Sequence, residues 1–128
     1  MAKGIEIRAA HFPGRAPIDS YGNGGFRFAD MSHRGSILCL PSGIHGWDMA
    51  VDTPLTVDHF QRILDEASDI EVLLVGTGTN LRLLPPALKT ALKARGIAPD
   101  PMSTGAAVRT FNIMLSEARA VAAALIAV

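Results

Sequence analysis

The chain has 128 residues and a mass of 13.5 kDa, which fits one domain and leaves little for a second. Its 12 Lys and Arg residues balance 12 Asp and Glu residues, and 48% of the residues are hydrophobic. This composition excludes an acidic disordered chain, and the lack of a basic excess argues against a nucleic acid partner. We therefore expect one globular domain over residues 1–128, with a loosely packed N-terminal segment at residues 1–16.

Several kinds of site and location are not expected. The one cysteine, Cys39, lies in the apolar run 36–40, which predicts a buried thiol, and it has no second cysteine for a disulfide. The four histidines show no metal-binding spacing, so we expect no metal and no cofactor. The N-terminus lacks the form of a signal peptide, and the longest apolar run, 120–128, is shorter than the about 20 residues of a membrane helix. The expected location is the cytoplasm, without membrane insertion.

The first half of the chain is rich in glycine and proline, which divide it into short strands. Residues 17–21 and 26–28 are predicted strands around a glycine-rich turn at 22–25. Residues 36–40 predict a buried strand, and residues 44–47 predict its partner. Together these segments predict a small antiparallel β portion.

The second half changes to helical spacing. Apolar residues recur at helical intervals over 57–67, and Thr56 is the expected N-cap. The nearly continuous apolar run 70–75 is typical of a strand that is covered on both faces. A second helix should begin near Pro85 and end before Gly96, because these residue types favour those positions. A helix, a strand, a loop and a helix in this order predict an α/β unit.

The last third contains two segments that resemble strands. Residues 97–102 include Pro99 and Pro101, which both remove a backbone donor from the same side of a strand. This pattern predicts an edge strand that is paired only through its other side. The tail, 119–128, stays ambiguous, since its alanines favour a helix while its larger apolar residues also suit a central strand.

A glycine loop, Gly76-Thr77-Gly78-Thr79, follows the most strand-like segment of the chain. The carboxyl end of a strand in an α/β sheet is a common ligand site, and backbone donors and hydroxyls there could hold an anion. Leu81 stands where a dinucleotide fingerprint needs its third glycine, and no Walker lysine follows. A tight structural turn is the leading interpretation, and an anion site is the alternative.

A third helix, predicted from Ser103 or Thr104 to about Ser116, places Arg109 and Asn112 on one face. Arg109 could receive a carboxylate or phosphate with help from the Asn112 amide. We favour the structural explanation, in which Arg109 is solvated and Asn112 ties the helix to a loop. The candidate anion pocket therefore combines two parts of the chain, with the members Gly76, Thr77, Gly78, Thr79, Thr104, Arg109 and Asn112. No catalytic constellation is recognisable, so no catalytic residue is predicted.

A set of short motifs, in this order and spacing, resembles the Mth-like domain family over about residues 18–128. The motifs are Gly35-Ser36-Ile37-Leu38, Trp47, Val75-Gly76-Thr77-Gly78-Thr79, Leu84-Pro85, Gly96-Ile97, Thr104, Thr110-Phe111-Asn112, Arg119 and Ala123-Ala124-Leu125-Ile126. The family includes a mitochondrial assembly factor of respiratory complex I and the adipogenesis-associated Mth domain-containing protein. The chain departs from the family pattern at Val108, where relatives often have cysteine, and at Ala118, where glycine is common.

The resemblance implies a three-layer α/β fold, in which helices flank a central mixed sheet with one strand running against the others. It also implies that residues 120–127 form a strand despite their alanine content. No reaction is established for the family, so the implied function is a soluble protein-interaction or assembly-helper module. The implied partner is a protein, such as a membrane complex under assembly, and the chain itself would be a monomer or small homo-oligomer. The alternative is an anion-binding protein or enzyme with its pocket between the Gly76–Thr79 loop and the Arg109/Asn112 helix.

Overall fold

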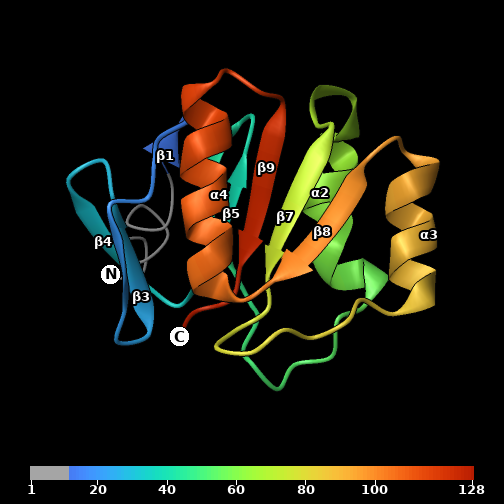
Figure 1. The fold of residues 1–128 in the computed structure, drawn as a ribbon, viewed down its shortest axis with the longest axis horizontal. Coiled ribbons are helices and arrows are strands. Elements are labelled where there is room, and N and C mark those ends of the chain that lie inside the picture. The colour runs from blue at the N-terminus through green and yellow to red at the C-terminus, as the bar shows by residue number, and fades with distance from the viewer. Residues whose placement is uncertain (1–11) are drawn as a thin grey trace, which may run out of the picture.

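A six-stranded mixed sheet forms the centre of the molecule, and helices and a separate three-stranded sheet cover it (Figure 1). The computed structural model describes residues 12–128. The strands of the large sheet follow the order β1-β6-β5-β9-β7-β8. Their bounds are β1 Phe12–Pro13, β5 Ser36–Leu40, β6 Gly43–Trp47, β7 Val72–Gly76, β8 Ala98–Met102 and β9 Val121–Leu125.

The direction of the strands corrects one detail of the expectation. Strands β6, β7, β8 and β9 run one way, and both β5 and β1 run against them. The resemblance implied a single opposed strand. The second is the two-residue β1, which pairs with β6 through Phe12 and Pro13.

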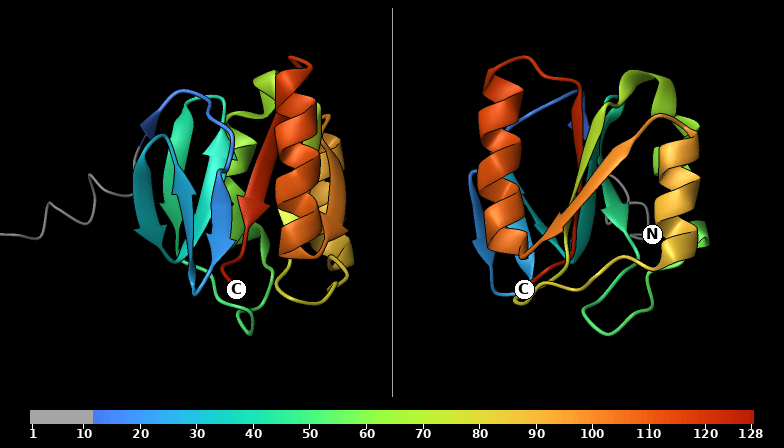
Figure 2. Two further views of the ribbon diagram at one scale, coloured as in Figure 1. Left: turned by 60° about the vertical axis from the view of Figure 1, so that its left-hand side comes forward. Right: turned by 45° about the vertical axis from the view of Figure 1, so that its right-hand side comes forward.

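Helices lie on both faces of the large sheet, as expected for three layers. The helices are α2 (Gln61–Asp65), α3 (Pro86–Ala94) and α4 (Thr104–Ser116). The packing clusters place α2 and α3 on one face, and α4 with the small sheet on the other. Figure 2 shows α4 and α3 on opposite sides of the strands.

The tail is a central strand, which confirms the family-based expectation over the local helix propensity. All five residues of β9 are buried, and the strand pairs with β5 on one side and β7 on the other. Ala122 and Ala124 face the α2 and α3 side, whereas Val121 and Leu125 face the α4 side. Burial between two layers therefore outweighs the weak preference of alanine for helix.

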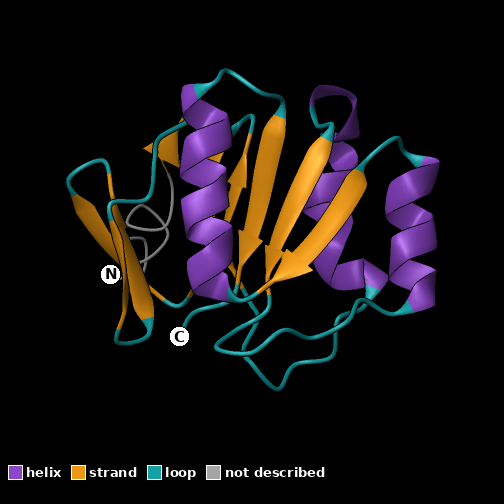
Figure 3. Ribbon diagram, in the orientation of Figure 1, coloured by secondary structure: helices purple, strands orange, loops and turns teal. Residues whose placement is uncertain are grey.

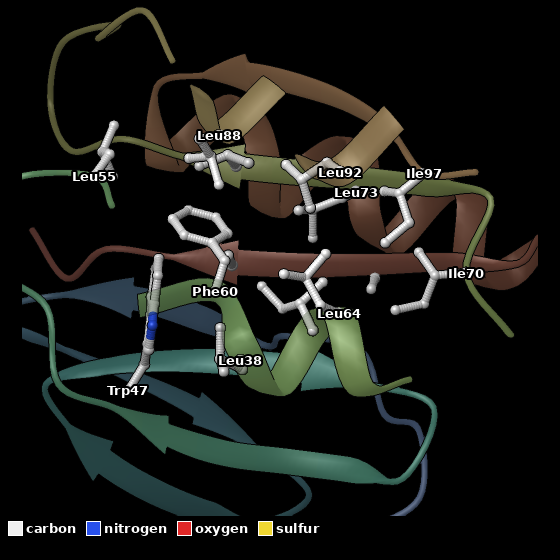
Figure 4. Close-up of a cluster of buried hydrophobic side chains, with 14 of the residues drawn as sticks. Leu38, Trp47, Leu55, Phe60, Leu64, Ile70, Leu73, Leu88, Leu92 and Ile97 are labelled. Atoms are coloured by element: carbon white, nitrogen blue, oxygen red, sulfur yellow. The ribbon is translucent and has the colours of Figure 1, made fainter. Parts of the chain in front are cut away.

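The core between the sheet and the α2 and α3 helices is built from large side chains (Figure 4). Phe60 and Leu88 are fully buried, and the Phe60 ring meets Trp47 edge-on with ring centroids 5.4 Å apart. Such aromatic pairs contribute about 0.5–1.5 kcal/mol beyond the area that they bury. This cluster holds the two helices on the sheet.

The first predicted helix is interrupted. A 3₁₀ turn at Val57–Phe60 precedes α2, and a second one at Ala67–Asp69 follows it. Thr56 makes no side-chain cap, because its hydroxyl bonds the His59 ring nitrogen Nδ1 at 2.9 Å instead. The apolar spacing identified the buried face, but one continuous helix over 57–67 is wrong.

The small sheet contains β2 (Ser20–Gly22), β3 (Gly25–Phe28) and β4 (Met31–Arg34), all antiparallel. The predicted hairpin is present, and β4 is an additional strand that the sequence did not suggest. The turn before β4 holds Ala29 and Asp30 at positive φ angles of 49° and 62°. Two residues with positive φ are typical of hairpin turns that match the twist of the strands.

The N-terminal segment that was expected to pack loosely is described only from residue 12 onward. Residues 1–11 lie outside the described residues. In the part that the structure describes, β1 is paired with β6 and Ala16 is buried.

Candidate functional site

The glycine loop lies where β7 ends, among the loops that gather at the carboxyl ends of β7, β8 and β9 (Figure 3). The Thr77 N–H donates to the Met102 carbonyl at 2.9 Å, and the Gly78 N–H donates to Thr104 Oγ1 at 3.0 Å. Thr77 Oγ1 lies 2.9 Å from the Asn80 carbonyl and accepts from the Arg82 N–H at 2.9 Å. These groups are engaged inside the protein, so the loop is the tight structural turn that was the leading interpretation.

The close approach of Thr104 and a positive φ explain the two glycines of the loop, Gly76 and Gly78. The buried hydroxyl of Thr104 donates to the Ile126 carbonyl at 2.7 Å and accepts from Gly78. A Cβ at Gly76 would stand 3.0 Å from the Thr104 Cα atom, and Gly78 has a φ of +112°. The first residue of α4 is therefore joined to the segments that follow β7 and β9, and Thr104 is a structural residue in this geometry.

Asn112 has a structural partner as well. Its Nδ2 donates to the Ile18 carbonyl and its Oδ1 accepts from the Ile18 N–H, both at 2.9 Å. Arg109 is exposed on the same helix and lines a depression of about 500 Å³ with Asp19, Tyr21 and other residues near β2. Arg109 therefore fits the solvated interpretation, and Asn112 ties the helix to a neighbouring segment.

The seven candidate residues do not share one pocket. Thr77 and Thr79 line a depression of about 300 Å³ together with Val51, Asn80 and Arg82, and the Arg109 depression is a different one. The two depressions are separate because the polar groups of the loop face Thr104 and β8, whereas Arg109 faces β2. The Gly76–Thr79 loop and Arg109 therefore lie beside two separate depressions.

Arg82 organises a feature that the sequence analysis missed. Its Nη1 donates to the Val51 carbonyl at 2.9 Å and its Nη2 to the Thr53 carbonyl at 3.0 Å. The guanidinium thus joins the loop after β7 to the loop after β6. With Arg82 turned inward, its neighbours Leu81 and Leu83 turn outward and are 55% and 81% exposed.

We call this region the two-loop surface, with Val51, Leu81 and Leu83 as its exposed apolar members. Val51 is 51% exposed and lies against the backbone of Gly78, where an added Cβ would be 3.1 Å from it. The sequence signal was available: an arginine between two leucines in a loop, outside any periodic segment.

Cys39 is the buried thiol that the sequence predicted. It is 3% exposed in β5, and burial raises the pKa of its thiol far above the usual range. A thiol in this state is not a nucleophile at neutral pH.

This architecture is shared with known proteins. The profile of the family described as "Protein of unknown function (DUF498/DUF598)" matches residues 18–126. The chain belongs to this family. The match covers both sheets except β1, and all three α-helices among the described residues.

The DUF498/DUF598 chain also shares its fold with a Bordetella pertussis protein described as a Mth938-like domain. That structure has a TM-score of 0.74 and 26% identity, with 87% of this chain and 85% of that chain covered. The Mth-like resemblance is thereby confirmed.

Two further relatives of this DUF498/DUF598 protein carry descriptive names. A crystal structure described as an outer membrane protein from Bartonella henselae is 62% identical to this chain, with a TM-score of 0.88. The alignment covers 91% of this chain and 98% of the Bartonella chain. The mouse NADH dehydrogenase (ubiquinone) 1 alpha subcomplex assembly factor 3 is 32% identical over 122 residues. That alignment covers 95% of this chain but 66% of the mouse protein, so the chain spans about two thirds of it. Within residues 12–128, no helix is long and apolar enough to cross a membrane.

Proposed function

We propose that this protein is an interaction module that helps a larger protein complex to assemble. The observation that carries the proposal is the similarity to assembly factor 3, which extends over 95% of this chain. The similarity therefore extends far beyond one short motif. The mouse protein is named for the assembly of NADH dehydrogenase, and a membrane complex of this kind is the proposed class of partner.

The two-loop surface is the proposed contact. Three of the five large hydrophobic residues that are exposed among the described residues lie on it: Val51, Leu81 and Leu83. Arg82 and Thr77 fix both loops by hydrogen bonds, so these side chains are held outward before any partner arrives. A preformed apolar surface binds with a smaller loss of conformational entropy than a loose one. The complementary partner surface is an apolar groove that takes the two leucines.

A capture experiment with matched variants tests the proposal. The tagged full chain is expressed in its native host as wild type, as Leu81→Ser/Leu83→Ser, and as Ile113→Ser. Ile113 is 54% exposed on α4 and provides the control for loss of an exposed apolar side chain. We expect the wild type and Ile113→Ser to recover the same partner, and the double variant to recover it about tenfold less, since central apolar anchors dominate binding energy. Failure of the wild type to recover a reproducible partner, or full recovery by the double variant, contradicts the proposal.

The location and the oligomeric state belong to the same proposal. We propose that the protein acts in the cytoplasm as a single domain of residues 1–128, as a monomer or a small homo-oligomer. Fractionation of cells that produce the untagged chain tests the location. Light scattering on the purified chain tests the oligomeric state.

A further inference from the structure

We propose that the outer face of the small sheet binds a phosphate-bearing small molecule between Arg27 and Arg34. The sequence offered an anionic ligand only as an alternative, and at the glycine loop and Arg109. This inference is independent of the proposed assembly role, and it moves the anion site to β2, β3 and β4.

The strand register puts both arginines on one face. Ser20 pairs with Arg27, which pairs with Ser32, and Gly25 pairs with Arg34. Side chains alternate along a strand, and Phe26 and Phe28 point into the core, so Arg27 points outward. Arg34 is two residues beyond Ser32 and points the same way. Diagonal neighbours of this kind have backbones about 7–8 Å apart, a spacing at which one ligand reaches both side chains.

The two arginines line one depression of about 380 Å³. Gly22 and Gly25, which carry no side chains, also line this depression. Ser20 and Ser32 contribute hydroxyls to the same depression, and Arg27 Nη1 donates to Ser32 Oγ at 3.1 Å. The volume lies in the range of about 300–1,000 Å³ that is typical of small-molecule sites.

The charge of this depression favours an anion. No Asp or Glu is among the residues that line it, although the chain as a whole has a formal net charge of zero. Within residues 12–128, the Arg34 guanidinium has no hydrogen bond or ion pair to a protein acceptor. Two guanidiniums of like charge in one depression repel each other, and a bound anion removes that repulsion. The Arg109 depression differs, because the carboxylate-bearing Asp19 lines it as well.

Phosphate fits this donor set better than a single carboxylate. A phosphate monoester carries about −1.5 to −2 charges at neutral pH and three acceptor oxygens. It can therefore bind two guanidinium forks and a serine hydroxyl at once, whereas one carboxylate has a single negative charge and only two acceptor oxygens. The rest of the 380 Å³ would hold the organic part of the ligand.

The probe is inorganic phosphate, added to the ¹⁵N-labelled full chain at constant ionic strength and slightly alkaline pH. We expect saturable shifts of the backbone amides of Gly25, Ser32 and Arg34, and none at Thr77 or Arg109, which line the two depressions described above. We also expect the Tm to rise by about 5 °C at ten times the dissociation constant. Acetate at the same ionic strength is the control ligand with a carboxylate group, and it should shift the same amides much less.

Variants assign the effect to the two arginines. Arg27→Gln and Arg34→Gln should each weaken phosphate binding by at least about tenfold, while Arg109→Gln should leave it unchanged. Both arginines are exposed, so these variants should keep the fold, and their unperturbed amide spectra check this. The proposal is overturned if phosphate shifts no amide of the small sheet. It is also overturned if acetate acts equally well, or if Arg27→Gln/Arg34→Gln still binds.

Discussion

The side-chain amide of Asn112 pairs with both backbone groups of Ile18, although 94 residues separate them in the sequence. The amide imitates a strand partner and fixes the segment that leads into β2 on the surface of α4. The small sheet therefore keeps its place partly through one side chain of a distant helix. Asn112 thus acts as a tether, the role that the sequence analysis favoured over that of a ligand donor.

Loss of this tether should destabilise the fold. Asn112→Ala removes two hydrogen bonds and leaves two backbone groups of Ile18 without their partner, so we expect a loss of about 3 kcal/mol in the free energy of unfolding. Asn112→Asp keeps the acceptor but not the donor, and should lose less. Ser116→Ala on the exposed side of the same helix is the control, expected within about 0.5 kcal/mol of wild type. Urea unfolding measures all three, and an unchanged Asn112→Ala would contradict the tether.

Loss of the Thr104 hydroxyl should also lower the free energy of unfolding. Thr104→Val keeps the shape but leaves the Gly78 N–H and the Ile126 carbonyl unpaired in a buried site, at a cost of about 2–3 kcal/mol. Thr104→Ser retains the hydroxyl and should cost about 1 kcal/mol for the lost methyl group. Thermal unfolding compares the two variants. Equal losses would show that the hydrogen bonds are not what Thr104 contributes.

The departure from the family pattern at Ala118 leads to a stabilising prediction. Ala118 has a φ of +57° just after α4, where its N–H donates to the Leu115 carbonyl and the Arg119 N–H donates to the Met114 carbonyl. This is the helix end that glycine favours, so Ala118→Gly should stabilise the fold by about 1 kcal/mol.

The end of α3 supplies the matched reverse change. Gly96 has a φ of +80° in the same kind of helix end, so Gly96→Ala should destabilise the fold by about 1 kcal/mol. Urea midpoints at one temperature measure both variants. Shifts of the same sign for the two substitutions would refute the argument.

Stability should depend on pH through His33. Burial lowers the pKa of His33 below its ordinary value of 6.5, and a hydrogen bond with the Ser36 backbone partly opposes this shift. The folded state then binds the His33 proton more weakly than the unfolded state does. This contribution to stability is complete above the unfolded pKa and decreases as the pH falls through 6.5 toward the folded pKa.

A variant separates His33 from the other groups that titrate in acid. His33→Gln should lose less stability than wild type when the pH is lowered from about 7.5 to about 5, as measured by urea unfolding. An NMR titration of the wild-type His33 ring gives its pKa directly. A ring pKa at or above 6.5 would show that burial is not the dominant influence.

Local physical rules were sufficient to predict several elements of the fold from the sequence. Pro86 begins α3, and Ser103 caps α4 with its side chain, as the residue types indicate. The β5–β6 hairpin follows from two apolar runs around a turn. Each of these features depends on a few neighbouring residues, which a single sequence contains.

Other elements depend on distant contacts. The alanine-rich β9 needed the family resemblance, because only its position between β5 and β7 makes it a strand. Strand β4 has a single apolar residue, Met31, and is held by pairing with β3 rather than by its own propensity. The separation of Arg109 from the glycine loop also depends on packing, since Arg109 lies within α4 and the loop follows β7. Their relative orientation is a property of the folded chain.

The two prolines of β8 have a consequence for the margin of the large sheet. The Ala98 N–H donates to Glu71 on the β7 side, so Pro99 and Pro101 turn the opposite way, toward an edge that has no strand partner among residues 12–128. This edge has no backbone N–H at either proline, so it has too few donors to pair with an additional strand. The strand at the opposite edge of the sheet, β1, has only two residues. Concentrated solutions of the native chain should therefore resist fibril growth through this sheet.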